Sequence, residues 1–336
     1  MTQKQDTPII LAIESSCDDT AAAVIKNRKI LANVVSSQTM HGVYGGVIPE
    51  LAGRAHQQYI LPVVDKALKD AGITASELNA IAYTRGPGLM GSLLVGSQFA
   101  KGMAMGLDIP TIGINHLQAH VAAHYIADEQ PGFPFLCLLV SGGHTQILLV
   151  KDYLDMEIIG STIDDAAGEA FDKTAKMLGL PYPGGPLVDQ LAEDGNPLAF
   201  QFPKANISGY NYSFSGLKTS LLYFLQKQTA ADPDFIKKNL NDICASMRHT
   251  IIKTLLSQFE KAIVDLKIQH IGIAGGVSAN RLLRRSLEEL GKKRKINTYI
   301  PAFEYCTDNA GMIAIAGHYQ FIKGQFNSLD DLPFAR

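Results

Sequence analysis

The stretch FLCLLVSGGHTQILLV, residues 135–150, decides which fold the sequence predicts. Apolar residues dominate both of its ends, and the glycine turn SGGH at 141–144 separates them. Two apolar runs joined by a short glycine turn indicate a buried strand and its returning partner. The chain also begins with strands of this kind, which we expect at residues 8–13, 21–25 and 30–35. Apolar strands of this kind therefore begin two parts of the chain.

Helices and strands alternate after each opening. We expect strands at 78–84, 110–114, 157–161, 270–274 and 297–300, and helices at 50–70, 89–106, 166–178, 236–266, 279–290 and 308–322. This alternation favours a duplicated α/β architecture with a cleft between two lobes. The polar stretch DEQPGF at 128–133 suits a linker. We therefore expect an N-terminal lobe at 1–130, closed by the C-terminal segment 308–336, and a second lobe at 131–307.

Composition excludes several classes of protein. The chain has 336 residues, 46% of them hydrophobic and 18% charged, which is a globular composition. A net charge of -2 excludes a globally basic nucleic-acid binder, and the 4 cysteines form no CxxC pair. Residues 1–8 carry no visible signal peptide, and no apolar run approaches the ~20 residues of a membrane helix. We expect a cytoplasmic protein without membrane contact.

Histidines in the segment NHLQAHVAAHY indicate a metal site. His116, His120 and His124 follow one another at four-residue intervals, so on a helix they share one face. No glutamate stands between the first two, so the HExxH general base of a metalloprotease is missing. A further ligand must come from elsewhere, and Asp308 is a candidate carboxylate, although an aspartate before a helix also serves as an N-cap. Cys306 is a competing ligand.

Two glycine turns have the composition of ligand-binding loops. Ser141-Gly142-Gly143 lets backbone N–H groups approach a phosphate or carbonyl, although a plain hairpin turn needs glycine too. Gly275-Gly276 precedes a helix, whose N-terminus suits a nucleotide, although such a pair also serves packing. Together they favour a nucleotide cleft.

Charged residues leave further alternatives open. The turn ESSCDDT at 14–20 lacks the glycine of sugar kinases, and its carboxylates either repel a bare triphosphate or form a solvated acidic turn. Asp172 and Asp189 could bind hydroxyl or amino groups of a ligand. The basic segment 281–295 is either a phosphate contact or a solvated helix end.

These motifs together resemble the TsaD/YgjD (Gcp) family of tRNA N6-threonylcarbamoyladenosine synthesis proteins. The resemblance spans nearly the whole chain, through ESSCDDT (14–20), RGPGLMGSLLVG (85–96), NHLQAH (115–120), LVSGGHT (139–145), GEAFDK (168–173), YPGGPLVD (182–189), SFSGLK (213–218), AGGVSAN (274–280) and CTDNAG (306–311). It implies an actin-like ATPase (ASKHA) fold of two duplicated α/β lobes. It also implies one metal ion, iron(II) or alternatively zinc, on His116, His120 and Asp308, which leaves His124 a neighbour.

The resemblance further implies a donor, an acceptor and partners. The donor, threonylcarbamoyl-AMP, is expected at Leu139, Val140, Ser141, Gly142, Gly143, Asp172, Gly185, Asp189 and Asn280. N6 of adenosine 37, in tRNAs that read codons beginning with A, attacks the carbamoyl carbon and AMP leaves. The family works with TsaB and TsaE, and the segment Arg85–Gly106 is expected to contact TsaB, although its glycines could equally serve internal packing. No residue is assigned as a general base.

Three other classes of protein compete with this interpretation. A metalloendopeptidase lacks its base here, and a sugar-kinase relative lacks the glycine of the first turn. A non-catalytic scaffold of a tRNA-modifying complex has no need of a metal-ligand set.

Overall fold

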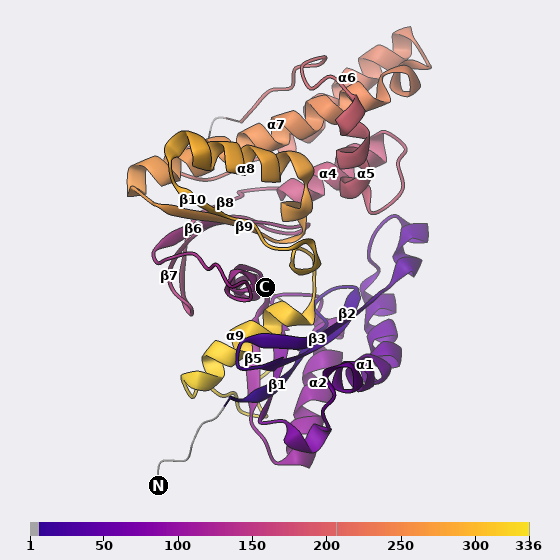
Figure 1. Ribbon diagram of the computed structural model, residues 1–336. Helices are drawn as coiled ribbons and strands as arrows, with labels where there is room; N and C mark the ends of the chain where they lie inside the picture. The colour runs from indigo at the N-terminus through magenta and orange to yellow at the C-terminus, as the bar shows by residue number, and fades with distance from the viewer. Residues whose placement is uncertain (1–6, 206, 336) are drawn as a thin grey trace. The chain divides into compact units, whose positions relative to one another are not determined.

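The computed structural model describes residues 7–205 and 207–335, which form two compact units (Figure 1). Unit 1 comprises residues 1–130 and 302–336, and unit 2 comprises residues 131–301. Residues 1–6, on which the expectation about a signal peptide partly depends, lie outside the described residues. Within the described ranges, no helix is both long and apolar enough to cross a bilayer.

Unit 1 is built on a mixed five-stranded sheet in the order β3-β2-β1-β4-β5. Its strands are β1 Ile9–Glu14, β2 Asp19–Lys26, β3 Lys29–Ser37, β4 Ala80–Gly86 and β5 Thr111–Asn115. The first three pair antiparallel, whereas β1, β4 and β5 run parallel. Asn27 and Arg28 both have positive φ, which makes the tight turn between β2 and β3 that the sequence predicts.

Helices cover both faces of this sheet (Figure 1). They are α1 Pro49–Ala71, α2 Met90–Leu107, α3 His116–Ala122 and α9 Ala310–Ile322. Leu11 and Ile13 point into the core formed with α1 and α2. On the other face α9 comes so near that a Cβ on Gly317 would lie 2.7 Å from that of Ala82. Both faces of the sheet are therefore packed against helices.

Unit 2 repeats the same topology. Its sheet has the order β10-β9-β6-β7-β8, with β6, β7 and β8 antiparallel and β6, β9 and β10 parallel. These strands are β6 Phe135–Val140, β7 Thr145–Asp152, β8 Asp155–Ser161, β9 His270–Ala274 and β10 Asn297–Tyr299. Read from β6 outward, this is the strand order of unit 1 read from β1 outward. The predicted duplication is confirmed.

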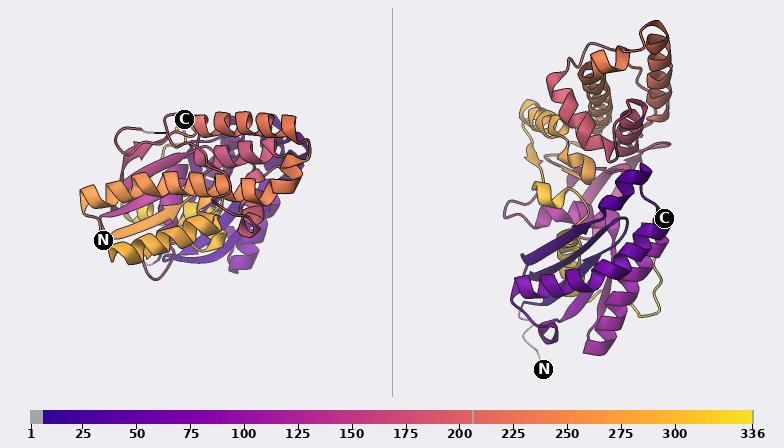
Figure 2. Two further views of the ribbon diagram at one scale, coloured as in Figure 1. Left: turned by 90° about the horizontal axis from the view of Figure 1, so that it is seen from above. Right: turned by 90° about the vertical axis from the view of Figure 1, so that its right-hand side faces the viewer.

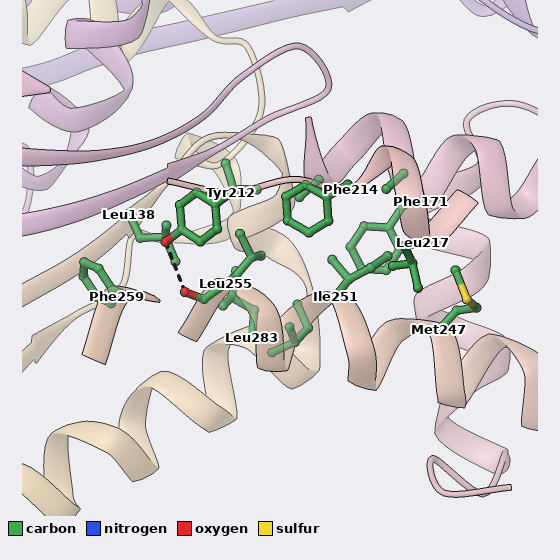
Figure 3. Packing of buried hydrophobic residues seen from close by; sticks show 14 of the residues in the cluster. Leu138, Phe171, Tyr212, Phe214, Leu217, Met247, Ile251, Leu255, Phe259 and Leu283 are labelled. Carbon is green, nitrogen blue, oxygen red and sulfur yellow. Dashed lines mark hydrogen bonds between the residues drawn. The ribbon is translucent and has the colours of Figure 1, made fainter. Parts of the chain in front are cut away.

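The helices described in unit 2 contact one another, with α7 and α8 side by side (Figure 2), and α8 also contacts β10. They are α4 Ala167–Met177, α5 Gly184–Leu191, α6 Ser215–Ala231, α7 Phe235–Leu266 and α8 Arg281–Arg294. Figure 3 shows the rings of Tyr212 and Phe214 between the sheet residue Leu138 and α7. The buried Tyr212 hydroxyl donates to the carbonyl of Leu255, so this core leaves that hydroxyl satisfied.

Candidate metal centre and ligand loops

The predicted ligands come together within unit 1. The side-chain oxygen of Asn115 accepts from the backbone N–H groups of Leu117 and Gln118, so α3 begins at His116, directly after β5. His120 follows one helical turn later. Oδ1 of Asp308, two residues before α9, lies 3.5 Å from His116 Nε2 and 3.2 Å from His120 Nε2.

The three side chains fit one metal ion. Their ligand atoms all lie within 4.8 Å of one another. Metal–nitrogen bonds near 2.1 Å in a tetrahedral site place ligand atoms about 3.4 Å apart, close to the two measured separations. Both ring nitrogens of His120 are buried, and neither has a hydrogen bond of acceptable geometry among the described residues. An ion on Nε2 would satisfy one of these two groups.

Three alternatives from the sequence are resolved. Asn309, not Asp308, caps α9, since its side-chain oxygen accepts from Met312 N, so the alternative that Asp308 serves as the N-cap is wrong. The ligand group found among the described residues includes neither Cys306 nor His124. Cys306 lies near the carbonyl of Ala302, and His124 sits in the 3-10 turn after α3.

Glu14 lies beside the candidate ligand His116, a contact that its place in the sequence did not predict. It ends β1 fully buried, and its Oε2 lies 3.2 Å from His116 Nδ1. The Thr84 hydroxyl and the Ser16 N–H also donate to its carboxylate. A solvated acidic turn is therefore the wrong interpretation for Glu14. A carboxylate that accepts from Nδ1 fixes the tautomer that leaves Nε2 free for a metal.

Opposite charges lie side by side in this buried cluster. Burial disfavours the charge on His116, but the carboxylates of Asp308 and Glu14 outweigh burial and raise its pKa to about 9. Burial likewise opposes ionisation of Asp308, but His116 and His120 lower its pKa to about 2. The pKa of Glu14 is also lowered, because the contacts with His116 outweigh burial. A cation is therefore favoured among these groups.

In unit 2, the first predicted ligand loop is a tight turn after β6. Ser141 N donates to the carbonyl of His144, and His144 N donates to Ser141 Oγ. A Cβ on Gly142 or Gly143 would meet no atom within 4 Å, so their backbone is open to a ligand. Leu139 and Val140 are fully buried in the sheet, where they pair with neighbouring strands.

Close backbone approaches assemble this region. A Cβ on Gly168 would lie 2.4 Å from the carbonyl oxygen of Ser141, and one on Gly275 would lie 2.5 Å from that of Val140. Gly275 also has a φ of +84°, which favours glycine. Asp172 Oδ1 accepts from the N–H groups of Gly184 and Gly185. Burial raises the pKa of Asp172 despite these two hydrogen bonds.

The remaining predicted residues meet at the start of α8. Asp189 Oδ2 accepts from Arg281 N at 3.2 Å, directly after Asn280. Asn280 caps α8, since its side-chain oxygen accepts from Leu283 N. The structure therefore brings Asp189 and Asn280 together, and it groups Asp172 with Gly185.

Several basic side chains of the segment 281–295 form contacts within unit 2. Arg285 pairs with Glu193, and Lys293 and Arg294 pair with Glu260. Arg284 donates to backbone carbonyls, including that of Pro301. These contacts favour the helix-end interpretation of the segment.

Solved structures of low sequence identity share the fold. HypF from T. kodakarensis superposes with a TM-score of 0.63 at 14% identity, covering 95% of this chain and 48% of HypF. The activator of 2-hydroxyisocaproyl-CoA dehydratase from Clostridium difficile, with bound ADPNP, superposes with a TM-score of 0.52 at 13% identity, over 96% of this chain and 100% of the activator. With the duplicated sheets, these likenesses define an actin-like ATPase fold, here carrying a candidate metal centre.

Sequence comparison gives the family. The model of the TsaD family, tRNA N6-adenosine threonylcarbamoyltransferase, matches residues 29–315. A protein of that name from Cytophaga hutchinsonii is 56% identical over 100% of this chain and 98% of its own length. Another, from Phocaeicola vulgatus, is 59% identical over 98% of each chain. The chain belongs to the TsaD family of transferases.

Proposed function

We propose that this protein transfers the threonylcarbamoyl group of threonylcarbamoyl-AMP to N6 of adenosine 37 in tRNAs that read codons beginning with A, releasing AMP. The observation that carries the proposal is the end-to-end similarity to proteins named for this activity. The site chemistry supports it, because unit 1 offers ligands for a cation and unit 2 offers a glycine turn with open space beside it. This substrate places the reaction in the cytoplasm.

The difficulty of the reaction lies in its nucleophile. The N6 lone pair is delocalised into the adenine ring, so the protein must position it and stabilise charge on the carbonyl or phosphate oxygens. The N–H groups of Gly142 and Gly143 are suited to hold the donor's carbonyl or phosphate oxygens. The carboxylates of Asp172 and Asp189 are suited to fix its hydroxyl or amino groups. The departing phosphate is itself a proton acceptor, so the reaction needs no strong general base.

The metal-ligand set supports a bound ion. His116, His120 and Asp308 would hold it, and when bound it would supply a Lewis acid that polarises the donor. Two imidazoles and a carboxylate suit iron(II), the expected ion, and also zinc. The carboxylate of Glu14 would orient the ring of His116 through its contact with Nδ1.

The outer face of α2 is the surface we assign to TsaB. Gly96 packs internally, whereas a Cβ on Gly102 or Gly106 would meet open space. Leu94, Gly102 and Gly106 recur at multiples of four residues and so share one face, next to Met105, which is 70% exposed. An apolar strip with bare backbone suits a second helix. TsaE and the synthase of the donor would complete the system.

A surface variant tests this partner assignment. Gly102→Leu would lower the affinity for TsaB, because the new side chain occupies the space a second helix needs. Lys227→Leu, an exposed position on α6, is the matched control for an added surface leucine. Titration calorimetry should show weaker binding for Gly102→Leu alone. Equal affinities for both variants would place the partner elsewhere.

A reconstituted assay tests the reaction. The protein, TsaB, TsaE, the donor synthase, ATP, threonine, bicarbonate and unmodified tRNA are combined, and digested tRNA is analysed by mass spectrometry. Wild type should yield N6-threonylcarbamoyladenosine and His116→Ala should not. If the wild type forms no product while an active relative does so in the same assay, a scaffold or a kinase-like function would be favoured instead. A chelator-sensitive peptidase activity would instead support the endopeptidase.

A further inference from the structure

Arg248 is a buried cation in unit 2 to which no role in the reaction has been given. It lies on α7 with only 5% of its surface exposed. Its guanidinium donates to Asp189 Oδ1 at 2.8 Å, to the carbonyls of Asp189 and Ala192 at 2.9 and 3.0 Å, and to the carboxylate of Glu193. The guanidinium therefore binds several acceptors at the C-terminal end of α5.

The contact with Asp189 fixes a junction between helices. Oδ1 of Asp189 is held from α7 by Arg248, and Oδ2 accepts from the N–H of Arg281, the first residue of α8. Asn280 precedes this N–H and caps α8. A buried carboxylate that is bonded through both oxygens cannot rotate freely. The contacts that orient the Asp189 carboxylate therefore also fix the position of Asn280.

The carboxylate still has acceptor capacity. Each ionised oxygen can accept two hydrogen bonds, and each accepts one in the contacts above. A ligand hydroxyl or amino group would thus meet an acceptor whose direction is already set.

We infer that Arg248 is a positioning residue for the nucleotide donor, acting through Asp189. This inference rests on the proposed function and deepens it. The guanidinium meets Asp189 through Nη1 and the carbonyl of Ala192 through Nη2, and a lysine ammonium with its single nitrogen cannot keep both contacts in this geometry. The effect should therefore fall on recognition of the AMP-containing donor and not on recognition of tRNA.

Steady-state kinetics of Arg248→Lys in the reconstituted system test the inference. We expect the KM for the donor to rise about tenfold, a typical coupling within one hydrogen-bond network, with kcat and the KM for tRNA within about twofold of wild type. The dissociation constant of AMP should rise in parallel. In an Asp189→Asn background, Arg248→Lys should add no further change. Glu193→Gln keeps the contact with Asp189 and should leave the donor KM unchanged.

Several results would overturn it. These are an unchanged donor KM in Arg248→Lys, an equal rise in the two KM values, or an undiminished effect in the Asp189→Asn background. If Arg248→Lys does not fold, as judged by circular dichroism, Asp189→Asn alone must still weaken AMP binding. A wild type that binds AMP but forms no product would defeat the proposed reaction, whereas the AMP affinities would still decide the role of Arg248.

Discussion

At the scale of single residues, the metal centre combines local spacing with contacts between distant residues. The proximity of His116 and His120 could be predicted, because residues four apart on a helix share one face. Glu14 could not, because it stands 102 residues before His116 and meets it only through the pairing of β1, β4 and β5. Its signal in the sequence, a glutamate directly after a buried strand, fits many acidic turns.

Glu14→Gln should weaken metal binding about tenfold, because a neutral amide is a poorer acceptor for His116 Nδ1–H and lowers the basicity of that ligand. Competition titration with a chromophoric chelator measures the affinity. Asp18→Asn removes a charge from the same turn and should have little effect. Equal affinities for the wild type and Glu14→Gln would show that Glu14 does not support the site.

The raised pKa of His116 predicts how stability depends on pH. In the metal-free chain this pKa is about 9, against 6.5 for an ordinary histidine. The stabilisation from its charge is therefore complete below about pH 6.5 and is lost as pH rises through about 9. The difference in the free energy of unfolding between wild type and His116→Gln, measured with urea in the presence of a chelator, should shrink over this range. A difference independent of pH would contradict the charged pairing.

At the scale of elements, glycines on one helix serve different purposes. A Cβ on Gly96 would lie 2.1 Å from Ser15 Oγ, whereas one on Gly102 would meet nothing within 4 Å. Gly96→Ala should destabilise the protein by about 1–3 kcal/mol through overpacking. Gly102→Ala should stabilise it by about 0.5–1 kcal/mol through helix propensity. Chemical denaturation checks both, and a stable Gly96→Ala would contradict the close packing of α2 on the turn after β1.

Helix bodies were predicted well, but the identity of their caps was not. The apolar spacing of 50–70 anticipates α1 at Pro49–Ala71 because burial on one face enforces that spacing. In contrast, the adjacent residues Asp308 and Asn309 are equally plausible N-caps of α9 by sequence. In the structure Asp308 pairs with His116 and His120, and Asn309 caps the helix. Asp164, three residues before α4, accepts from Phe214 N at the start of α6. Such choices depend on tertiary neighbours.

At the scale of the whole molecule, the two units share one strand order. The repeated hairpin made the duplication predictable, whereas the pairing of β1 with β4 and of β6 with β9 depends on crossovers that no local pattern encodes. The loops proposed to bind the donor illustrate the same limit, because Gly168 meets Ser141 and Asp189 meets Arg281 only after folding. The topology explains why these residues meet.

The most direct test follows one labelled group. Threonylcarbamoyl-AMP carrying carbon-14 in its threonine is mixed with an excess of the protein, TsaB, TsaE and tRNA, and RNA-bound label and free AMP are counted in a single turnover. The proposed transfer predicts one labelled nucleoside for each AMP released, and no label on tRNA in which adenosine 37 is replaced by guanosine. AMP released without label on the tRNA, while a known relative labels the same tRNA, would contradict it.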